Sequence, residues 1–187
     1  PDQQFRCYSA SQEAQYTDVY NHRLANWESV SELGSANKIA SGLCGALPAN
    51  AETIRIHSAG DFFNISYFRA WLLVAKRNPD VIFYAYTKMN PFWVKSRAIM
   101  PDNLIMTASR GGKWDHLIDE HNLREVVVVY SEEEADELGL ELDNDDSHAA
   151  DPDRRDQNFA LLIHGMGPAG SLQAKIAATV RKSKISA

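Results

Sequence analysis

Cysteine is scarce in this sequence. Its 187 residues include two, Cys7 and Cys44, and they contain no Cys-x-x-Cys pair and no Cys/His finger spacing. A chain of this length can bury a sizeable core without disulfide bonds, so its stability does not depend on a disulfide scaffold. A structural zinc site lacks its usual ligand spacing. We therefore expect two reduced thiols, as in a cytoplasmic protein.

Long apolar runs and a surplus of basic residues are absent as well. No apolar stretch approaches the roughly 20 residues that cross a bilayer, and the opening PDQQFRCYSA lacks the basic and apolar regions of a secretion signal. No membrane partner is expected, although a start at Pro1 instead of Met leaves room for missing upstream residues. The net charge of −6 argues against broad binding to duplex DNA but allows a local basic pocket.

The composition is otherwise that of a globular protein, with 44% apolar and 24% charged residues, and the length fits a single α/β domain over residues 1–187. Residues 1–50 are predicted to form a helical N-terminal segment. Large side chains there recur at three- and four-residue steps along one helix face. They are Tyr16, Val19, Tyr20, Leu24, Trp27 and Val30. The small-residue stretch 34–48 fits a short helix and a loop equally well.

From residue 52 onward, strand patterns alternate with helix patterns. The expected strands are apolar or β-branched runs at 53–57, 81–86, 104–107, 126–130 and 159–164. The expected helices cover 64–77, 91–100, 114–121, a brief acidic stretch from Ser131, and 172–182. Such alternation predicts a parallel sheet with right-handed crossovers. A complete eight-fold barrel needs about 250 residues, so we expect a partial βα barrel or an open parallel sheet with flanking helices.

One segment interrupts this alternation. Residues 141–157 are rich in Asp and poor in apolar side chains, which predicts an inserted acidic loop on the surface. The run from Asp143 to His148 lacks the glycine and the glutamate that an EF-hand loop requires at its sixth and twelfth places. A solvated loop is the simplest interpretation. A metal site that joins Asp145 or Asp146 with His148 is the alternative.

Candidate site residues follow from the predicted sheet. In parallel α/β folds, ligands bind beyond the carboxyl ends of the strands. The residues at these ends are His57 with Asp61, Thr87 with Lys88, Ser109 with Arg110, Tyr130, and His164 with Gly165. Together they could bind a phosphate or carboxylate and move protons near neutral pH. Each also has an ordinary structural explanation, such as a hydrogen-bonded histidine, or a helix cap at Asp61.

A Gly-x-Gly-x-x-Gly phrase formed by Gly165, Gly167 and Gly170 lies between the last predicted strand and helix. Backbone amides there would suit a phosphate or pyrophosphate, and a plain tight turn explains the pattern nearly as well. A dinucleotide-binding unit does not fit, because residues 171–187 hold no second strand and no acidic partner for a ribose.

Several phrases together resemble a bacteriophage family. They are IRIHSAGDF at 54–62, FYAYTK at 83–88, shorter matches at 7–10 and 162–165, and the helix with Trp71 that ends at Asn78 and Pro79. Over residues 7 to about 175, the chain resembles the gene-product eighty-eight family of phage proteins. That family is similar, more remotely, to phage proteins of radical-SAM type, whose fold is a partial βα barrel. The resemblance implies a phage-encoded protein in the host cytoplasm with the architecture predicted above.

The cysteines depart from that resemblance. Members of the family carry several, near the equivalent of Cys7 and late in the chain, where this sequence is rich in Asp. A [4Fe–4S] cluster of radical-SAM type needs three thiolates on one loop, which two distant cysteines do not supply. An iron–sulfur enzyme would therefore need ligands from missing upstream residues. A barrel that kept its pocket and lost its cluster is the preferred interpretation.

Two classes of function fit these patterns. In the first, a pocket at the strand ends binds a nucleotide or a small phosphorylated ligand. The assigned residues are Lys88 and Arg110 for the anion, His57 or His164 for proton transfer, and Asp61 to orient a ring. A variant uses these two histidines and Asp61 for metal-assisted hydrolysis. In the second, a non-catalytic protein binds a host protein through its acidic face, residues 132–156, either by mimicking nucleic acid or by docking on a basic partner. The sequence identifies no cofactor.

Overall fold

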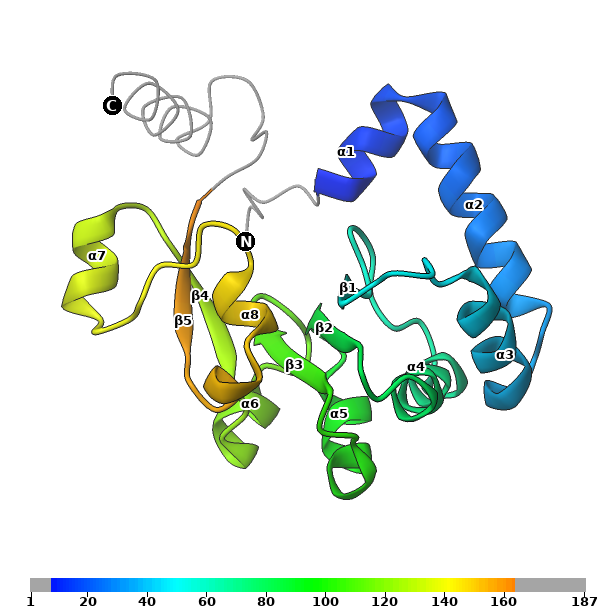
Figure 1. Ribbon diagram of the computed structural model, residues 1–187. Helices are drawn as coiled ribbons and strands as arrows, with labels where there is room; N and C mark the ends of the chain where they lie inside the picture. Colours follow the sequence, from blue (N-terminus) through cyan, green and yellow to red (C-terminus); the bar gives the residue numbers. More distant parts are fainter. Residues whose placement is uncertain (1–7, 164–187) are drawn as a thin grey trace.

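A computed structural model of the protein describes residues 8–163 (Figure 1). The predicted helix at 172–182 and the glycine phrase at 165–170 lie outside these residues. Three helices come first along the described chain: α1 (Tyr8–Gln15), α2 (Thr17–Ser31) and α3 (Ala36–Ala46). The predicted N-terminal helices are therefore confirmed. The small-residue stretch forms a helix because Ser35 caps it, its side chain accepting the Lys38 N–H.

Five parallel strands follow in the sequential order β1-β2-β3-β4-β5. They are β1 (Thr53–Arg55), β2 (Ile82–Thr87), β3 (Leu104–Ser109), β4 (Glu125–Val129) and β5 (Phe159–Leu162). With sequential order, right-handed crossovers place the connecting helices on one face of the sheet. The result is a five-stranded half-barrel with flanking helices (Figure 1). This confirms the predicted fold class, a partial βα barrel.

The outer face of the half-barrel packs against the crossover helices. These are α4 (Ile65–Arg77), α5 (Asn90–Ser96) with the short 3-10 helix η1 (Arg97–Ile99), α6 (His116–His121) and α7 (Glu132–Glu137). Alternate residues of β2 point to this face, so that Phe83 and Ala85 are buried in one cluster with Phe68 and Trp71 of α4. Consecutive residues of β2 are buried, so both faces of this strand are covered, which explains its nearly continuous apolar sequence.

The inner face of the half-barrel is covered by residues 141–157, which contain α8 (Ser147–Ala150) and the 3-10 helix η2 (Pro152–Arg154). Leu142 forms a parallel bridge with Ala160 of β5. Ala149 of α8 packs in a cluster whose other buried members come from four neighbouring strands. These members are Tyr84, Ile105, Val126 and Phe159. The segment therefore closes the open side of the half-barrel.

The structure here differs from the predicted acidic surface loop. Asp145 is exposed, but Asp143, His148 and Ala149 are buried. The Asp143 carboxylate is satisfied within its own segment, since it accepts the N–H groups of Asp145 at 3.3 Å and Ala149 at 3.0 Å. An acidic residue can therefore be buried here without an external partner.

Helix α2 forms as predicted, but its aromatic face is not packed. None of its residues is buried. Tyr20 and Trp27 are 47% and 52% exposed, and the preceding Tyr16 is 49% exposed. The contact with α1 runs through Arg23, which bonds to Glu13 and Gln12. Within residues 8–163, none of the helices has the length and apolar character that a membrane span requires.

Candidate functional site

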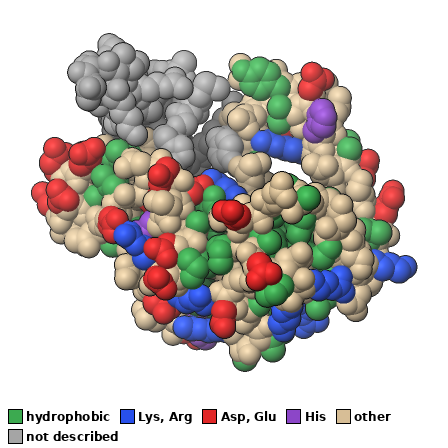
Figure 2. Space-filling view, viewed as in Figure 1, with side chains coloured by type: hydrophobic (Ala, Val, Ile, Leu, Met, Phe, Trp, Pro, Cys, Tyr) green, Lys and Arg blue, Asp and Glu red, His purple; other side chains and the backbone are tan. Residues whose placement is uncertain are grey.

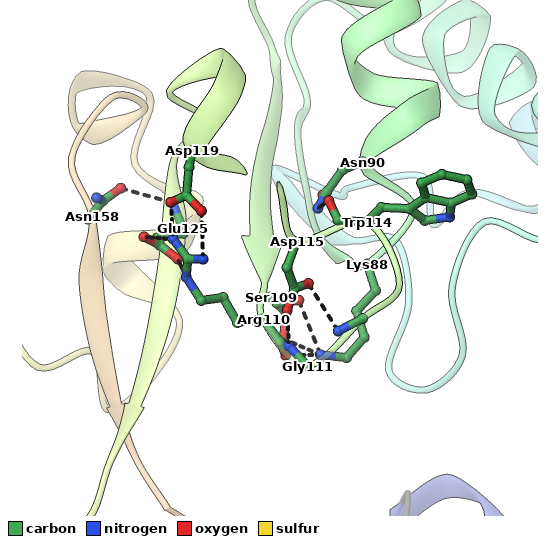
Figure 3. A network of polar contacts seen from close by, with 11 residues as sticks. Lys88, Asn90, Ser109, Arg110, Gly111, Trp114, Asp115, Asp119, Glu125 and Asn158 are labelled. Carbon is green, nitrogen blue, oxygen red and sulfur yellow. Dashed lines mark hydrogen bonds and ion pairs between the residues drawn. The ribbon is translucent and has the colours of Figure 1, made fainter. Parts of the chain in front are cut away.

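The carboxyl ends of the first three strands carry most of the predicted site residues. Parallel pairing places Arg55 beside Tyr84 and Thr87 beside Ala108, so the loops after β1, β2 and β3 leave the sheet at a common edge. In the described chain these loops hold His57, Asp61, Lys88 and Arg110. Figure 3 shows the network that surrounds the last two.

Asp61 joins the loop after β1 to the end of β2. Its Oδ1 accepts hydrogen bonds from the Phe62 N–H at 2.7 Å and from the Thr87 hydroxyl at 2.6 Å. Its Oδ2 accepts the main-chain N–H of Lys88 at 2.7 Å. The cap of α4, which was the alternative explanation for Asp61, is made by Asn64. Asp61 thus fixes the point from which the Lys88 side chain starts.

His57 lies against aromatic side chains. Its Nε2 is 3.1 Å from the Tyr67 hydroxyl, and its ring makes an edge contact with Phe62, with 4.7 Å between the centroids. Burial lowers the pKa of His57 to about 4, while the charge of Asp61 raises it and that of Arg55 lowers it by smaller amounts. The imidazole is therefore neutral at neutral pH. Its buried Nδ1 has no hydrogen-bond partner among residues 8–163.

The Lys88 side chain reaches from the end of β2 to the loop after β3 (Figure 3). Its ammonium donates to the carbonyl and the hydroxyl of Ser109, each at 3.1 Å, and to the carbonyl of Arg110. A Cβ added at Gly112 would lie 3.0 Å from the Lys88 Cβ, and one added at Gly111 would lie 3.5 Å from Nζ. The glycine pair therefore lets the lysine lie close against this loop.

The Arg110 guanidinium points away from Lys88, toward α6 and β4 (Figure 3). It pairs with Asp119 at 2.6 Å and with Glu125, whose Oε1 lies 2.9 Å from Nη2. The two carboxylates raise the pKa of Arg110, and the guanidinium lowers the pKa of Asp119. The structure therefore brings the main chain of Arg110 next to Lys88, but not its guanidinium.

Two residues of this network were missed by sequence reasoning. The Asp115 carboxylate accepts the N–H groups of Gly111 at 2.8 Å and Gly112 at 3.0 Å. Asn90 is fully buried, and its Nδ2 donates to the Trp114 carbonyl at 3.2 Å. The only signal in the sequence is a glycine pair at a predicted strand end, followed within four residues by an aspartate.

A second polar cluster lies on the inner face and was also missed. Asp146 accepts the hydroxyls of Tyr84 at 3.0 Å and Tyr86 at 2.9 Å, and it pairs with Arg55 at 2.7 Å. Burial and Asp146 together raise the pKa of Tyr84 to about 12 and raise that of Tyr86 as well. Three partners from β1 and β2 thus hold α8 in place.

This cluster bears on the metal site suggested for Asp145 or Asp146 with His148. Asp146 is engaged by Arg55 and two tyrosines. His148 bonds to Arg124 through Nδ1 and stacks on the Phe159 ring. Burial, and then the Arg124 charge, lower the pKa of His148. Among residues 8–163, no group of three or more His, Cys, Asp and Glu side chains is placed to hold a metal ion.

The remaining predicted residues fall into two groups. Tyr130 follows β4 and is 43% exposed. His164, Gly165, Gly167 and Gly170 lie outside the described residues. The structure therefore brings His57, Asp61, Lys88 and the Arg110 main chain to one edge, and it leaves the predicted C-terminal part of the site untested.

Comparison with known proteins agrees with the predicted phage family. The Gene 88 protein of Mycobacterium phage L5 is 44% identical over 52 residues, which cover 28% of this chain and 22% of that relative. No solved structure matches. The more remote likeness to radical-SAM proteins gains no support from these matches. A family model described as Gene product 88 matches residues 3–183. Because this match spans nearly the whole sequence, the chain belongs to the Gene product 88 family of bacteriophage proteins.

Proposed function

We propose that this phage protein binds a nucleotide or another small phosphorylated ligand at the carboxyl edge of its half-barrel. The observation that carries the proposal is the placement of Lys88, whose ammonium lies at the glycine-containing loop after β3. A lysine next to main-chain amides is a common way for proteins to bind phosphate.

The lysine is positioned before any ligand arrives. Asp61 holds the Lys88 main chain, and Ser109 accepts two bonds from its ammonium. A cation whose position is already fixed loses less side-chain entropy on binding. We assign anion recognition to Lys88 and not to the Arg110 guanidinium, because two carboxylates already bind the latter.

His57 is the candidate proton acceptor of this site. Burial lowers its pKa to about 4, so the imidazole is neutral at neutral pH and free to take up a proton, but it is a weak base there. The proposed role of Asp61 is to hold the loops, because its oxygens bind Thr87 and the Lys88 N–H. His164 is a second candidate for proton transfer, and the metal-assisted variant requires it. Gly165, Gly167 and Gly170 are further candidate phosphate contacts, since they follow β5.

Calorimetric titration of the full chain with ADP and pyrophosphate tests this proposal. Lys88→Met should weaken binding about tenfold or more, since it removes a charge-assisted hydrogen bond. Lys95→Met is the matched control, because Lys95 is an exposed lysine on the neighbouring helix α5. It should bind as the wild type does. No binding by the wild type, or equal binding by both variants, would remove the proposal.

A second candidate function is docking on a basic host protein through an acidic surface. Helix α7 exposes four carboxylates, and Figure 2 shows acidic side chains gathered on that part of the molecule. They belong to Glu132, Glu133, Asp136 and Glu137. Leu138 beside them is 54% exposed, so an apolar contact is also available. Such a surface would attract and orient a basic partner.

Capture from host lysate tests this second candidate. The test variant changes the four α7 carboxylates to their amides. The control variant changes four other exposed carboxylates: Glu28, Glu32, Asp80 and Asp102. Deletion of residues 141–156 is a poor test, because the buried side chains of that segment cover the inner face. The docking function predicts that a captured protein is lost only with the α7 variant, and unchanged capture would contradict it.

A further inference from the structure

The glycine loop of the proposed site already holds an anionic group. The two oxygens of the Asp115 carboxylate accept the successive N–H groups of Gly111 at 2.8 Å and Gly112 at 3.0 Å (Figure 3). Successive amides that converge on one anion form the same kind of nest that binds phosphate in other proteins. The loop is therefore arranged for an anion, and a side chain of the protein itself occupies that position.

We propose that the Asp115 carboxylate stands in for the phosphate of the ligand and competes with it. A phosphomonoester or pyrophosphate group displaces the carboxylate, bonds to the Gly111 and Gly112 amides and pairs with the Lys88 ammonium. This inference rests on the proposed function. It adds where the anion binds and which group occupies that position when no ligand is bound.

The surroundings allow such an exchange. The Asp115 side chain makes no capping bond to α6, so its displacement leaves that helix intact. The main chain beside it is held independently, because the Asn90 amide donates to the Trp114 carbonyl. Gly111 has a φ of +92°, a conformation that glycine adopts without strain, and the loop keeps this shape whichever anion it binds.

Charge makes the competition measurable. A second negative group about 4 Å from a bound phosphate costs about 1 kcal/mol in water, which corresponds to about a fivefold change in affinity. Removing the Asp115 charge should therefore strengthen the binding of an anion. Removing a polar side chain that contacts a ligand usually weakens binding. The expected gain in affinity therefore separates this inference from a merely structural role for Asp115.

The experiment is a calorimetric titration of the full chain with pyrophosphate, together with the amide NMR signals of Gly111 and Gly112. Asp115→Asn should bind about fivefold more tightly than the wild type. Glu120→Gln removes one charge from an exposed residue of α6 and should change affinity by less than twofold. At saturation, the two glycine amides should shift in the wild type and in Asp115→Asn.

Four outcomes decide the inference. Tighter binding by Asp115→Asn, with shifted glycine amides, supports it. If that variant does not fold, Asp115→Ala, which removes both acceptor oxygens and frees the two amides, should show the same gain. Equal or weaker binding by the folded variants, while Lys88→Met still weakens binding about tenfold or more, overturns this inference and leaves the proposed function standing. No binding by the wild type or the Asp115 variants overturns both.

Discussion

The Asp61 carboxylate offers the sharpest single perturbation of the site. Asp61→Ala removes the acceptor of three hydrogen bonds, from the Phe62 N–H, the Thr87 hydroxyl and the Lys88 N–H. A hydrogen bond to a charged group contributes about 1.5–3 kcal/mol. Thr87 is 2% exposed, so its hydroxyl has no water to replace the carboxylate. Phe62 is 1% exposed, so its N–H is left without a partner as well, whereas the N–H of the exposed Lys88 can bond to water and recover part of its loss. We therefore expect the free energy of unfolding to fall by about 3 kcal/mol.

Equilibrium unfolding in urea measures this loss. Asp80→Ala is the control, because Asp80 is exposed, and it should change stability by less than about 0.5 kcal/mol. Asp61→Ala should also weaken pyrophosphate binding, since the main chain of Lys88 is no longer held. A loss of stability below about 1 kcal/mol would refute the reasoning that this carboxylate fastens the loops after β1 and β2 together.

Three other perturbations test the helical packing, the buried histidine and the inner face. Trp71→Ala should lower the free energy of unfolding in urea by about 3–5 kcal/mol, because Trp71 is 5% exposed. Trp27→Ala should lower it by less than about 1 kcal/mol, because Trp27 is 52% exposed. Equal losses would contradict the open packing of α2. The pKa of His57 is lowered from 6.5 to about 4 on folding, so the unfolded state binds the extra proton and stability falls as the pH drops from 6.5 to 4, by up to about 3 kcal/mol. His57→Gln should lose this dependence of stability on pH, and an unchanged dependence would argue against the burial of His57. Asp146→Asn should lower the pKa of Tyr84 from about 12, as read by absorbance during alkaline titration, and no change would count against the Asp146 contact.

The fold was largely predictable because its signals are local. The apolar run from Val81 to Tyr86 corresponds to β2, which begins and ends one residue later, at Ile82 and Thr87. Asn64 begins α4 by accepting the Tyr67 N–H, as its residue type predicts. Alternation of these elements then fixes parallel pairing, because a crossover helix returns the chain to the same end of the sheet.

The cover of the inner face was not predictable in this way. Residues 141–157 have neither helical nor strand periodicity, and an acidic composition normally indicates a solvated loop. Their burial depends on contacts that only the fold provides. The Asp143 side chain bonds to its own segment, and Asp146 reaches Tyr84 and Arg55, which are 62 and 91 residues away.

The candidate site was predictable to the level of backbone position and no further. Strand ends place Lys88 and Arg110 at one edge, as expected from the topology. The direction of the Arg110 side chain is set by Asp119 and Glu125, and no pattern in the sequence marks these as its partners. Asp115 went unnoticed because a lone aspartate after two glycines is common in ordinary turns.

A crystal structure of the full chain with pyrophosphate tests the central claim most directly. The account predicts an anion bonded to the Gly111 and Gly112 amides within hydrogen-bond distance of the Lys88 Nζ, with the Asp115 carboxylate moved away. Pyrophosphate bound only elsewhere, with Lys88 still on the Ser109 oxygens and Asp115 still on the glycine amides, would contradict it.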